Sequence, residues 1–421
     1  MTIRVKIDHI GAKGDGIVTG PDGPLYVPYA VDGDDLEIKL QGRQGRIRHI
    51  HNSSPHRRDP VCRHFGRCGG CALQHVSQTY YADWKQEQVR TALGHRGFDD
   101  VTILAPEISP PGRRRRTRLN AVGQGAGKAI VGFSERASHN LVDLAECPVL
   151  RPEIVDLVAP LRDFLGPQLT PRQKMAVQIN LAENGLDIIL EGTGEPDLDL
   201  RMDIAAFAEA EDIARICWLD TKLKKPFHEI LCERRKPRVT FDGRRVFPPP
   251  GAFLQATAEG EAALSRFMKG ALGDADRIVD LFAGCGTFTV ALIGDHAVHA
   301  VEGDREMVEA LEKSARQMGA IRNLTTEARD LFLRPLLPHE LNGFDAAVID
   351  PPRAGARDQA AEIARSDLEK VVMISCNPAT FARDARILVE GGFVMGDILP
   401  VDQFLYSAHL EVIATFSRPE N

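Results

Sequence analysis

Hydrophobic and polar positions follow two different rhythms along this 421-residue chain. From about residue 250 onward, short apolar runs alternate with segments of helical length. Buried apolar strands that alternate with helices predict a parallel α/β sheet. The expected elements are strands over 277–282, 298–301, 344–349 and 371–375, helices over 306–318 and 380–390, and two final strands over 393–399 and 409–416.

Residues 1–55 instead show short runs in which apolar and polar residues alternate, separated by glycine-rich turns. This pattern predicts a small all-β unit. A five-stranded barrel of the OB type is the expected architecture, and such barrels commonly bind single-stranded nucleic acid. The clearest strand segments are 4–10, 25–28, 36–40 and 45–50.

A mixed region lies between these two parts. Cysteines are frequent just after residue 60, and the pattern that follows them predicts a helix over 78–93. Farther along, one helical stretch and several strand-like pieces alternate with polar loops: the helix 152–165 and the strands 129–133, 175–180 and 186–191. We therefore expect three domains: a β-barrel over 1–58, a central mixed α+β domain over 59–245 and an α/β domain over 246–421.

The composition is that of a soluble globular protein, with 43% hydrophobic and 26% charged residues, and it excludes a wholly disordered chain. No apolar run approaches the ~18 residues that a membrane helix needs, and the N-terminus has no signal-peptide core. We therefore expect a cytoplasmic protein that does not enter a membrane. In that compartment the eight cysteines are more often free, metal-bound or catalytic than disulfide-bonded.

Charge is distributed unevenly along the chain. The net charge is −7, but residues 1–150 carry +5 and the remainder carries −12. Basic residues are concentrated in 39–75 and again in the arginine run 113–118. Such clusters on an otherwise acidic chain are typical of phosphate contact and indicate nucleic acid as a partner. A solvated basic face explains the same pattern equally well.

A glycine-rich turn, 280–288, ends the first strand of the α/β domain. Gly284 and Gly286 let the backbone of this turn approach a bound ligand closely. Glu302 lies at the end of the next strand, where a carboxylate can hold both ribose hydroxyls. Val290 occupies the place of the third glycine of a dinucleotide site. The pattern therefore favours S-adenosylmethionine, and a tight turn beside a surface acid is the alternative.

Cys376 follows directly after the apolar strand 371–375. Ligands of open α/β sheets bind in the crevice at the carboxyl ends of the strands. A cysteine there can act as a nucleophile, and the N-terminus of the next helix is expected to lower the pKa of its thiol. The alternative is an ordinary structural cysteine, since free cysteine is among the most buried residues.

A nucleophilic cysteine beside a methyl donor indicates one chemistry in particular. Carbon 5 of a pyrimidine is a weak nucleophile until a thiolate adds to carbon 6. After methyl transfer, a base must remove the proton from carbon 5 so that the cysteine can leave. Glu411, at the start of the last apolar strand, is the candidate base, and an exposed acid at a strand end is the alternative.

The cysteine-rich region has the most specific spacing, with Cys62, Cys68 and Cys71 separated by few residues that include glycines. Cys147 is the candidate fourth ligand, because two other distant cysteines lie in apolar or basic contexts. Four thiolates fit either zinc or an iron–sulfur cluster. Zinc modules usually pair two Cys-x2-Cys units, so a single unit with a distant Cys-Pro favours a [4Fe–4S] cluster. Unrelated structural cysteines are the remaining alternative.

Together these motifs make the chain resemble the S-adenosylmethionine-dependent RNA uracil-5-methyltransferases, in particular the iron–sulfur-containing branch that acts on 23S ribosomal RNA. The segments that carry the resemblance most strongly are 253–255, 280–282, 350–355, 375–384 and 409–411. The resemblance implies a TRAM-type N-terminal barrel, a central domain that carries the cluster, and a class I (Rossmann-like) methyltransferase domain. It also implies RNA as the substrate.

The same resemblance assigns roles to individual residues. It implies that Cys376 is the nucleophile and Glu411 the proton acceptor. The cofactor residues that it implies are Gln255, Phe282, Glu302 and Asp350. The [4Fe–4S] ligands that it implies are Cys62, Cys68, Cys71 and Cys147. No protein partner is implied, and we expect a monomer.

The sequence departs from the family pattern at a few positions, among them Ala283 and the segment 404–408. These departures leave the target RNA open, so a tRNA uracil-5-methyltransferase is the nearest alternative. A non-catalytic iron–sulfur RNA-binding or assembly factor is the alternative from another class, and the joint presence of Cys376, Glu411 and Asp350 argues against it. A radical enzyme would need an open coordination site at the cluster, and a cytosine-5 methyltransferase would favour proline or threonine before the cysteine.

Overall fold

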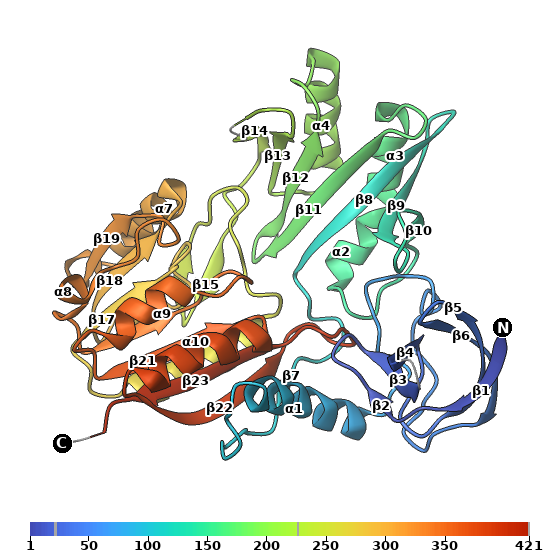
Figure 1. Cartoon of the computed structure of the whole chain (residues 1–421). Coiled ribbons are helices and arrows are strands. Elements are labelled where there is room, and N and C mark those ends of the chain that lie inside the picture. Colours follow the sequence, from blue (N-terminus) through green and yellow to red (C-terminus); the bar gives the residue numbers. More distant parts are fainter. Residues whose placement is uncertain (21–22, 225–226, 420–421) are drawn as a thin grey trace.

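The computed structural model describes residues 1–20, 23–224 and 227–419. Within these ranges the strands form three large sheets and one two-stranded sheet. Each large sheet forms one lobe with any helices that cover it, and the three lobes surround a common centre (Figure 1).

The N-terminal sheet contains six described strands in the order β1-β5-β6-β4-β3-β2. Its small core includes Val27, Leu36 and Ile38, which are fully buried. The strands are β1 (Thr2–Lys6), β2 (His9–Ile10), β3 (Asp15–Gly20), β4 (Gly23–Pro28), β5 (Asp35–Gln41) and β6 (Gln44–Asn52). The prediction of five strands is wrong, because two loop residues divide the expected strand 4–10 into β1 and β2. The closed barrel and its TRAM assignment stay predictions.

The central sheet contains seven described strands in the order β10-β9-β8-β11-β12-β13-β14. Only β12 and β13 are parallel, because a helix connects them. Three described helices pack on one face of the sheet, where the ring centres of Phe164 and Phe207 lie 4.4 Å apart. The elements are β8 (Arg116–Gly125), β9 (Lys128–Ser134), β10 (Leu141–Asp143), α2 (Pro152–Asp156), α3 (Val158–Gln168), β11 (Lys174–Ala182), β12 (Gly185–Gly192), α4 (Leu198–Ala210), β13 (Arg215–Asp220) and β14 (His228–Glu233). A two-stranded sheet follows, made of β15 (Val239–Phe241) and β16 (Arg244–Val246).

The C-terminal sheet contains eight described strands in the order β19-β18-β17-β20-β21-β23-β22-β7. The first five strands in this order are parallel, as predicted, and β23 is antiparallel to both of its neighbours. The elements after β16 are α5 (Ala258–Leu272), β17 (Arg277–Leu281), α6 (Thr289–Leu292), β18 (Ala297–Glu302), α7 (Arg305–Gln317), η1 (Ile321–Asn323), β19 (Leu324–Ala328), α8 (Pro338–Leu341), β20 (Ala346–Ile349), α9 (Arg357–Ala364), β21 (Lys370–Ser375), α10 (Pro378–Glu390), β22 (Val394–Asp402) and β23 (Glu411–Ser417).

Helices cover both faces of the C-terminal sheet, since successive residues of a strand point to opposite faces. In β17, Ile278 joins the apolar core that contains Leu264 of α5. The next residue, Val279, joins the core that contains Phe381 of α10. The carboxyl ends of the parallel strands are left at one edge of this layered structure, which is where a ligand site is expected.

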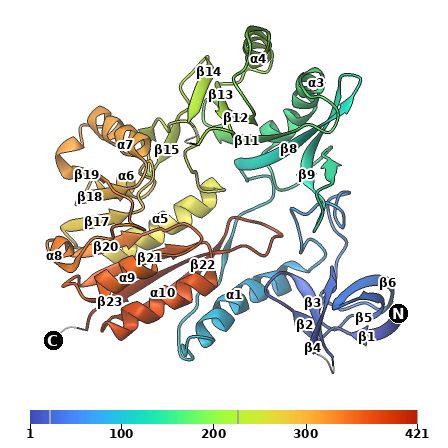
Figure 2. The ribbon, with the colours of Figure 1, turned by 45° about the horizontal axis from the view of Figure 1, so that its top comes forward.

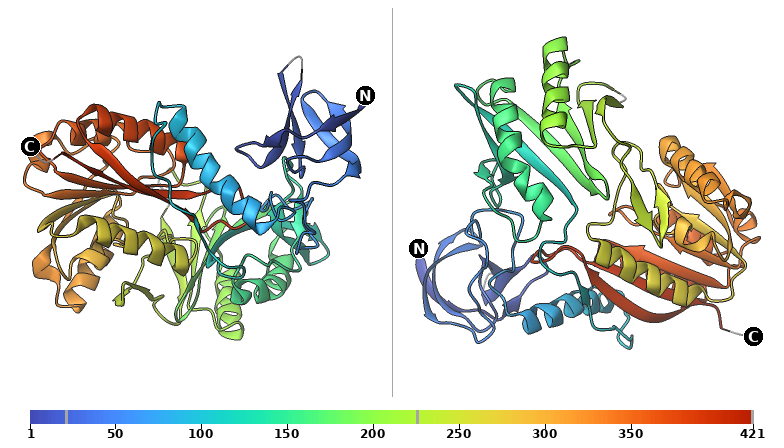
Figure 3. Two further views of the ribbon diagram at one scale, coloured as in Figure 1. Left: turned by 90° about the horizontal axis from the view of Figure 1, so that it is seen from below. Right: turned by 180° about the vertical axis from the view of Figure 1, so that it is seen from behind.

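Two elements from the N-terminal half of the chain complete the C-terminal lobe. Helix α1 (Gln78–Gly94) packs against α10 and β22, and β7 (Glu107–Ile108) pairs with β22 at the edge of the sheet. Figures 2 and 3 show that α1 runs beside α10 and reaches toward the N-terminal sheet. The stretch 59–245 therefore contributes to two lobes, and the domain boundaries stay predictions.

Most elements expected from the sequence lie within a few residues of the observed ones, with two kinds of exception. The expected helix 152–165 is divided into α2 and α3 at Leu157. Several elements were not predicted, among them β8, β10, β13, β14 and α4 in the central sheet and α5, β19 and α9 in the C-terminal lobe. In the described part of the chain, no helix has the length and apolar character to span a bilayer.

Candidate active site

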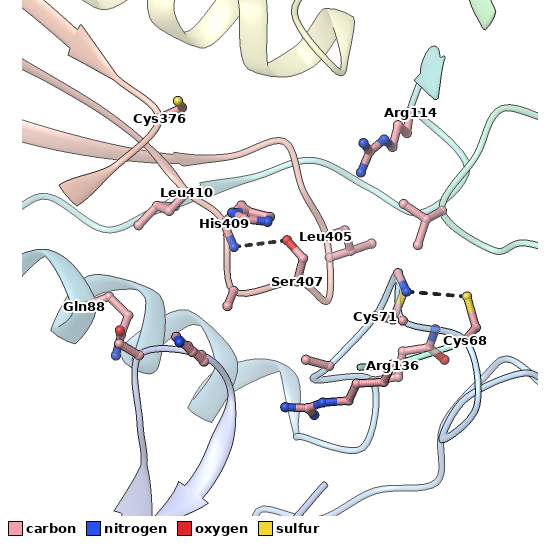
Figure 4. Close-up of a pocket in the computed structure, with 18 of the residues that line it drawn as sticks. Cys68, Cys71, Gln88, Arg114, Arg136, Cys376, Leu405, Ser407, His409 and Leu410 are labelled. Atoms are coloured by element: carbon pink, nitrogen blue, oxygen red, sulfur yellow. Dashed lines mark hydrogen bonds between the residues drawn. The ribbon is translucent and has the colours of Figure 1, made fainter. Parts of the chain in front are cut away.

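One cavity of about 840 Å³ lies where the three lobes meet. Its walls come from the N-terminal sheet, α1, the central sheet, the end of β21 and the β22–β23 loop (residues 403–410). Cys376 faces this cavity (Figure 4). So does the set that we call the cysteine group, which consists of Cys62, Cys68, Cys71 and Cys147. Two features that were predicted separately thus share one cavity.

Cys376 lies between the end of β21 and the start of α10, as predicted. The N-cap of α10 is Asn377, whose side-chain oxygen accepts a hydrogen bond from Ala379 N at 3.1 Å. Pro378 follows at the first helical position, where its fixed φ suits the start of a helix. The chain therefore turns at Cys376 and leaves its side chain half-buried at the cavity wall.

The electrostatic surroundings of Cys376 differ from the expectation. Burial, with smaller contributions from Glu411 and Asp350, raises the pKa of its thiol to about 11. Arg353 acts in the opposite direction and is outweighed. The expectation of a lowered pKa is therefore wrong for the free protein, because lost solvation outweighs the field of the helix N-terminus. At neutral pH the free protein holds Cys376 as a thiol.

Glu411 begins β23, which pairs with β21 so that Val412 lies opposite Ser375. The two groups predicted to do the chemistry therefore start from neighbouring positions on adjacent strands. Glu411 is only 3% exposed, so the alternative of an exposed strand-end acid is wrong. Burial, with a contribution from Asp350, raises the pKa of its carboxyl to about 8, and Arg116 opposes this rise.

The glycine-rich turn between β17 and α6 contains an unsatisfied polar atom. Asp280 is buried, and its Oδ2 accepts a hydrogen bond from the Thr289 hydroxyl at 2.5 Å. Its Oδ1 has no hydrogen-bond partner among the described residues, and burial raises the pKa of the carboxyl to about 7. Gly286 has a φ of 97°, and a Cβ there would meet Leu311 at 2.5 Å, so this position requires glycine.

Glu302 and Phe282 belong to the same turn. Glu302 Oε2 accepts a hydrogen bond from Gly284 N at 2.9 Å, so the end of β18 orders the turn. Phe282 has a φ of 64°, in the left-handed region, and its ring lies 5.4 Å from that of Phe332. Backbone strain of this kind is concentrated at ligand and catalytic sites. The turn thus has the features of a binding loop rather than of a simple connection.

Gln255 and Asp350 are joined by hydrogen bonds. Gln255 is buried, and its amide donates to Asp350 Oδ2 at 3.4 Å. Gln403, at the start of the β22–β23 loop, donates to Gln255 Oε1 at 2.6 Å. Burial, with a contribution from Asp280, raises the pKa of Asp350 to about 7. The structure therefore joins two of the residues assigned to the cofactor, Gln255 and Asp350, and brings Asp350 within electrostatic reach of Glu411.

The cysteine group lies on loops that the central sheet supports. Cys62 N donates to the Gln74 side chain at 3.1 Å, and Gly69 N donates to the carbonyl of Ser134 in β9 at 2.9 Å. All four thiols are free, and burial raises the pKa of each, that of Cys71 to about 12. Each thiol also lies within electrostatic reach of at least one other member of the group.

The cysteine group is not arranged as a preformed metal site. In the described ranges, no group of three or more His, Cys, Asp or Glu side chains is placed so as to hold a metal ion. The choice between zinc and an iron–sulfur cluster therefore stays a prediction from the sequence.

The arginine run divides into two sets. One set forms ion pairs with carboxylates of the same chain: Arg113 with Glu259 at 3.3 Å, Arg115 with Glu261 at 2.5 Å and Arg118 with Glu191 at 2.5 Å. For Arg114 and Arg116, no described carboxylate lies within ion-pair distance. The Arg116 guanidinium stacks 3.9 Å from the ring centre of Phe253, and Arg114 points into the cavity (Figure 4). Three of the run's five arginines therefore already have carboxylate partners, and contact of the run with phosphate stays a prediction.

Sequence reasoning missed three buried polar residues at this site: Lys85, Asp402 and Gln403. A signal existed for Lys85, because it lies one helical turn from both Tyr81 and Val89 on the buried face of α1, where lysine is unusual. No signal existed for Asp402 or Gln403, since their partners lie far away in the sequence.

Known proteins are similar to this chain over nearly its whole length. The sequence model of the tRNA (Uracil-5-)-methyltransferase family matches residues 250–418. A protein of Brucella suis biovar 1 (strain 1330), named an uncharacterized RNA methyltransferase, is 40% identical over 418 residues, which cover 99% of this chain and 98% of the relative. The 23S rRNA (uracil(1939)-C(5))-methyltransferase RlmD of Alteromonas naphthalenivorans is 30% identical over 433 residues, which cover 99% of this chain and 89% of the relative.

A solved structure supports the fold. The tRNA (uracil-54, C5)-methyltransferase of Pyrococcus abyssi, in complex with S-adenosyl-L-homocysteine, matches with a TM-score of 0.75 and 22% sequence identity. The match covers 98% of this chain and 100% of that one, and it shows the class I methyltransferase fold. With identities of 40% and 30% to relatives over nearly its whole length, this chain belongs to the S-adenosylmethionine-dependent RNA uracil-5-methyltransferases.

Proposed function

We propose that this protein transfers a methyl group from S-adenosylmethionine to carbon 5 of one uridine in 23S rRNA, through a covalent adduct between Cys376 and carbon 6 of the base. The observation that carries this proposal is the placement of Cys376 and Glu411 at neighbouring ends of β21 and β23, beside a basic cavity. In this arrangement a nucleophile and a base can act in turn on adjacent carbons of one pyrimidine.

The proposed reaction proceeds through the following bond changes. The Cys376 thiol gives its proton to solvent, its sulfur bonds to carbon 6, and the electrons of the double bond between carbons 5 and 6 move toward oxygen 4, which makes carbon 5 part of an enolate. Carbon 5 then bonds to the methyl group of S-adenosylmethionine as the bond from this methyl to the sulfonium sulfur breaks, and S-adenosylhomocysteine is the leaving group. Glu411 takes the proton from carbon 5, the double bond between carbons 5 and 6 re-forms, and the sulfur leaves as a thiolate. No net oxidation or reduction occurs.

The residues of the C-terminal sheet fit S-adenosylmethionine. The unpartnered Asp280 Oδ1 is a buried acceptor that a polar group of a ligand can satisfy. Glu302 ends the strand beside this turn, where it can accept hydrogen bonds from ribose hydroxyls. The residues that we propose to contact the cofactor are Gln255, Phe282, Glu302 and Asp350.

The chemistry of the cysteine group fits a [4Fe–4S] cluster. Four thiolates are the usual ligands of such a cluster, and each binds a different iron. The electrostatic proximity of the four thiols supports one ligand that they share. We propose that the cluster joins Cys147 to the loop from Cys62 to Cys71. It would thereby fix this loop to the central sheet.

The cavity is lined by more basic than acidic side chains, which favours binding of RNA. Among the described residues that line it, Glu146 is the one carboxylate. The lysines and arginines that line it are Lys13, Arg96, Arg114, Arg136 and Arg353. A chain with a net charge of −7 repels RNA over most of its surface, so a local basic cavity decides where RNA binds. We propose that all three lobes contact the RNA backbone there, the N-terminal one as a TRAM domain.

The choice of 23S rRNA rests on the relatives. The relative named for 23S rRNA is 30% identical over almost the whole chain, whereas the tRNA enzyme of known structure is 22% identical. One observation supports a tRNA target instead: the family model that matches residues 250–418 is named for tRNA (Uracil-5-)-methyltransferases.

Replacing Glu411 by glutamine is expected to block release of the product while adduct formation continues. Glutamine has the same shape as glutamate but cannot take the proton from carbon 5, so turnover should fall by about 10²- to 10⁴-fold. A methylated protein–RNA adduct should accumulate, which a denaturing gel detects. Normal turnover without an adduct would mean that another group removes the proton.

The raised pKa of Glu411 also sets the sign of the pH dependence. A base acts only when it is unprotonated, so decay of the adduct should accelerate as the pH rises toward about 8 and should level off above it. The residual decay in Glu411→Gln should lack this rise.

Replacing Lys13 and Arg96 together by alanine is expected to weaken RNA binding. Both side chains are exposed on the cavity rim, one on the N-terminal sheet's side and the other just beyond α1. If each contacts one phosphate, the slope of log affinity against log salt should fall by about 1.4 to 1.8. The control is Arg113→Ala with Arg118→Ala, because these exposed arginines already have carboxylate partners. An equal change in both double variants would contradict a local RNA site in the cavity.

A further inference from the structure

The β22–β23 loop leads directly into Glu411, and one of its residues has an unfavourable backbone conformation. Tyr406 has a φ of 63°, in the left-handed region that favours glycine. Its side chain is buried among apolar residues. Conformations of this kind persist only where the surrounding structure over-determines them.

Helix α1 supplies one part of that surrounding structure. Tyr406 N donates to the Tyr81 hydroxyl at 2.9 Å, and this hydroxyl donates to Asp402 Oδ2 at 2.5 Å. Asp402 Oδ1 accepts a further hydrogen bond from Phe404 N at 3.0 Å. One phenol oxygen of α1 thus connects the end of β22 to the strained residue of the loop.

Lys85, one helical turn along α1 from Tyr81, holds the other end of the loop. Its side chain is fully buried, and its Nζ lies 3.2 Å from Asp402 Oδ1. The same Nζ donates to the backbone oxygen of His409, two residues before Glu411. A single buried ammonium group therefore spans the loop from its beginning to its end.

The loop that carries Cys71 holds Tyr406 from the other side. Ala72 N and Leu73 N both donate to Tyr406 O, at 2.8 Å and 3.0 Å. The backbone nitrogen of Tyr406 is thus bound by α1, and its backbone oxygen is bound by the cysteine-rich loop. These contacts together account for the persistence of its left-handed conformation.

We propose that Tyr81, Lys85 and Asp402 are positioning residues that hold the β22–β23 loop so that Glu411 reaches carbon 5 of the bound base. This inference rests on the proposed role of Glu411. Apolar residues of similar volume often stabilise a core as well as a buried ion pair does, so stability alone gives little reason for Lys85 and Asp402. Their hydrogen bonds go instead to the backbone of one loop, which indicates that they serve the geometry of that loop.

Tyr81→Phe tests this inference, because it removes only the oxygen that joins Asp402 to Tyr406. The variant should form the adduct with RNA at about the wild-type rate but release methylated RNA on the order of ten- to a hundredfold more slowly, since small displacements of a reacting group have effects of this size. Tyr80→Phe is the matched control, because it makes the same change at a hydroxyl that faces Asp32 of the N-terminal lobe at 3.4 Å. It should release product as the wild type does. Thermal unfolding and cofactor binding, measured on both variants, separate a folding defect from a positional one.

A double variant separates this inference from the proposed base. If Tyr81 acts through Glu411, then adding Tyr81→Phe to Glu411→Gln should change adduct decay by less than about twofold. Equal slowing in both backgrounds would overturn the positioning role. So would wild-type release by Tyr81→Phe, or adduct formation slowed as much as release. Normal release by Glu411→Gln alone would instead overturn the base assignment.

Discussion

Replacing Cys376 by alanine is expected to abolish methyl transfer to RNA while S-adenosylmethionine still binds. Without the sulfur, carbon 5 of uracil stays a weak nucleophile, and turnover should fall on the order of 10⁴-fold or more. Cofactor affinity should be unchanged, because Gln255, Glu302 and Asp350 lie on other strands and loops. Transfer of a labelled methyl group measures the first effect, and calorimetric titration with the cofactor measures the second.

RNA that contains 5-fluorouridine should trap the wild-type protein covalently, because fluorine cannot leave carbon 5 as a proton does. Cys376→Ala should not be trapped, whereas Cys232→Ala, which changes a half-buried cysteine on β14, should be trapped normally. Trapping on 23S rRNA but not on tRNA supports the proposed target, and trapping on tRNA alone would reverse it. An adduct with Cys376→Ala would show that another residue is the nucleophile.

The purified protein is expected to be brown and to contain about four iron and four sulfide ions per chain. Both should be lost when any one ligand becomes serine, since an alcohol does not replace a thiolate in such a cluster. The four ligands to be tested are Cys62, Cys68, Cys71 and Cys147. The measurement is the content of iron and acid-labile sulfide per chain after anaerobic preparation.

Two other cysteines supply the controls for the cluster. Cys217 and Cys232 lie on β13 and β14 and do not line the cavity. Their replacement by serine should leave the iron content unchanged. Stoichiometric zinc without iron in the wild type would contradict the cluster, and so would iron that survives the loss of a proposed ligand.

The positions of the proposed reacting groups could be predicted from the sequence because these positions are local. Cys376 follows an apolar strand, Glu411 begins one, and Asp280 is the last residue but one of another. The carboxyl ends of parallel strands gather at one edge of a sheet, which places Cys376 and Asp280. Glu411 reaches the same edge because β23 is antiparallel to β21. The resemblance to a family then supplied the roles that the residues alone left open.

The contacts that hold these groups in place could not be predicted, because they join segments that are far apart in the sequence. The ion pair of Lys85 with Asp402 joins residues from opposite ends of the chain. The pKa of Cys376 was predicted in the wrong direction because a helix N-terminus can be read from the sequence, whereas burial and the proximity of Glu411 cannot. The ion pairs of Arg113 and Arg115 with α5 could not be predicted either, because α5 lies about 145 residues farther along the chain.

The position of α1 also determines when this helix can pack during synthesis of the chain. The buried side chains of α1 pack against α10, β22 and the β22–β23 loop. The ribosome makes those partners about 300 residues later, which at about 5 to 20 residues per second means a delay of roughly 15 to 60 seconds. During this interval the apolar face of α1 has no native partner, and Lys85 remains in water. Helix α1 therefore completes its packing only after these partners have been made, and a ribosome that stalls before residue 400 leaves α1 without the β22–β23 loop.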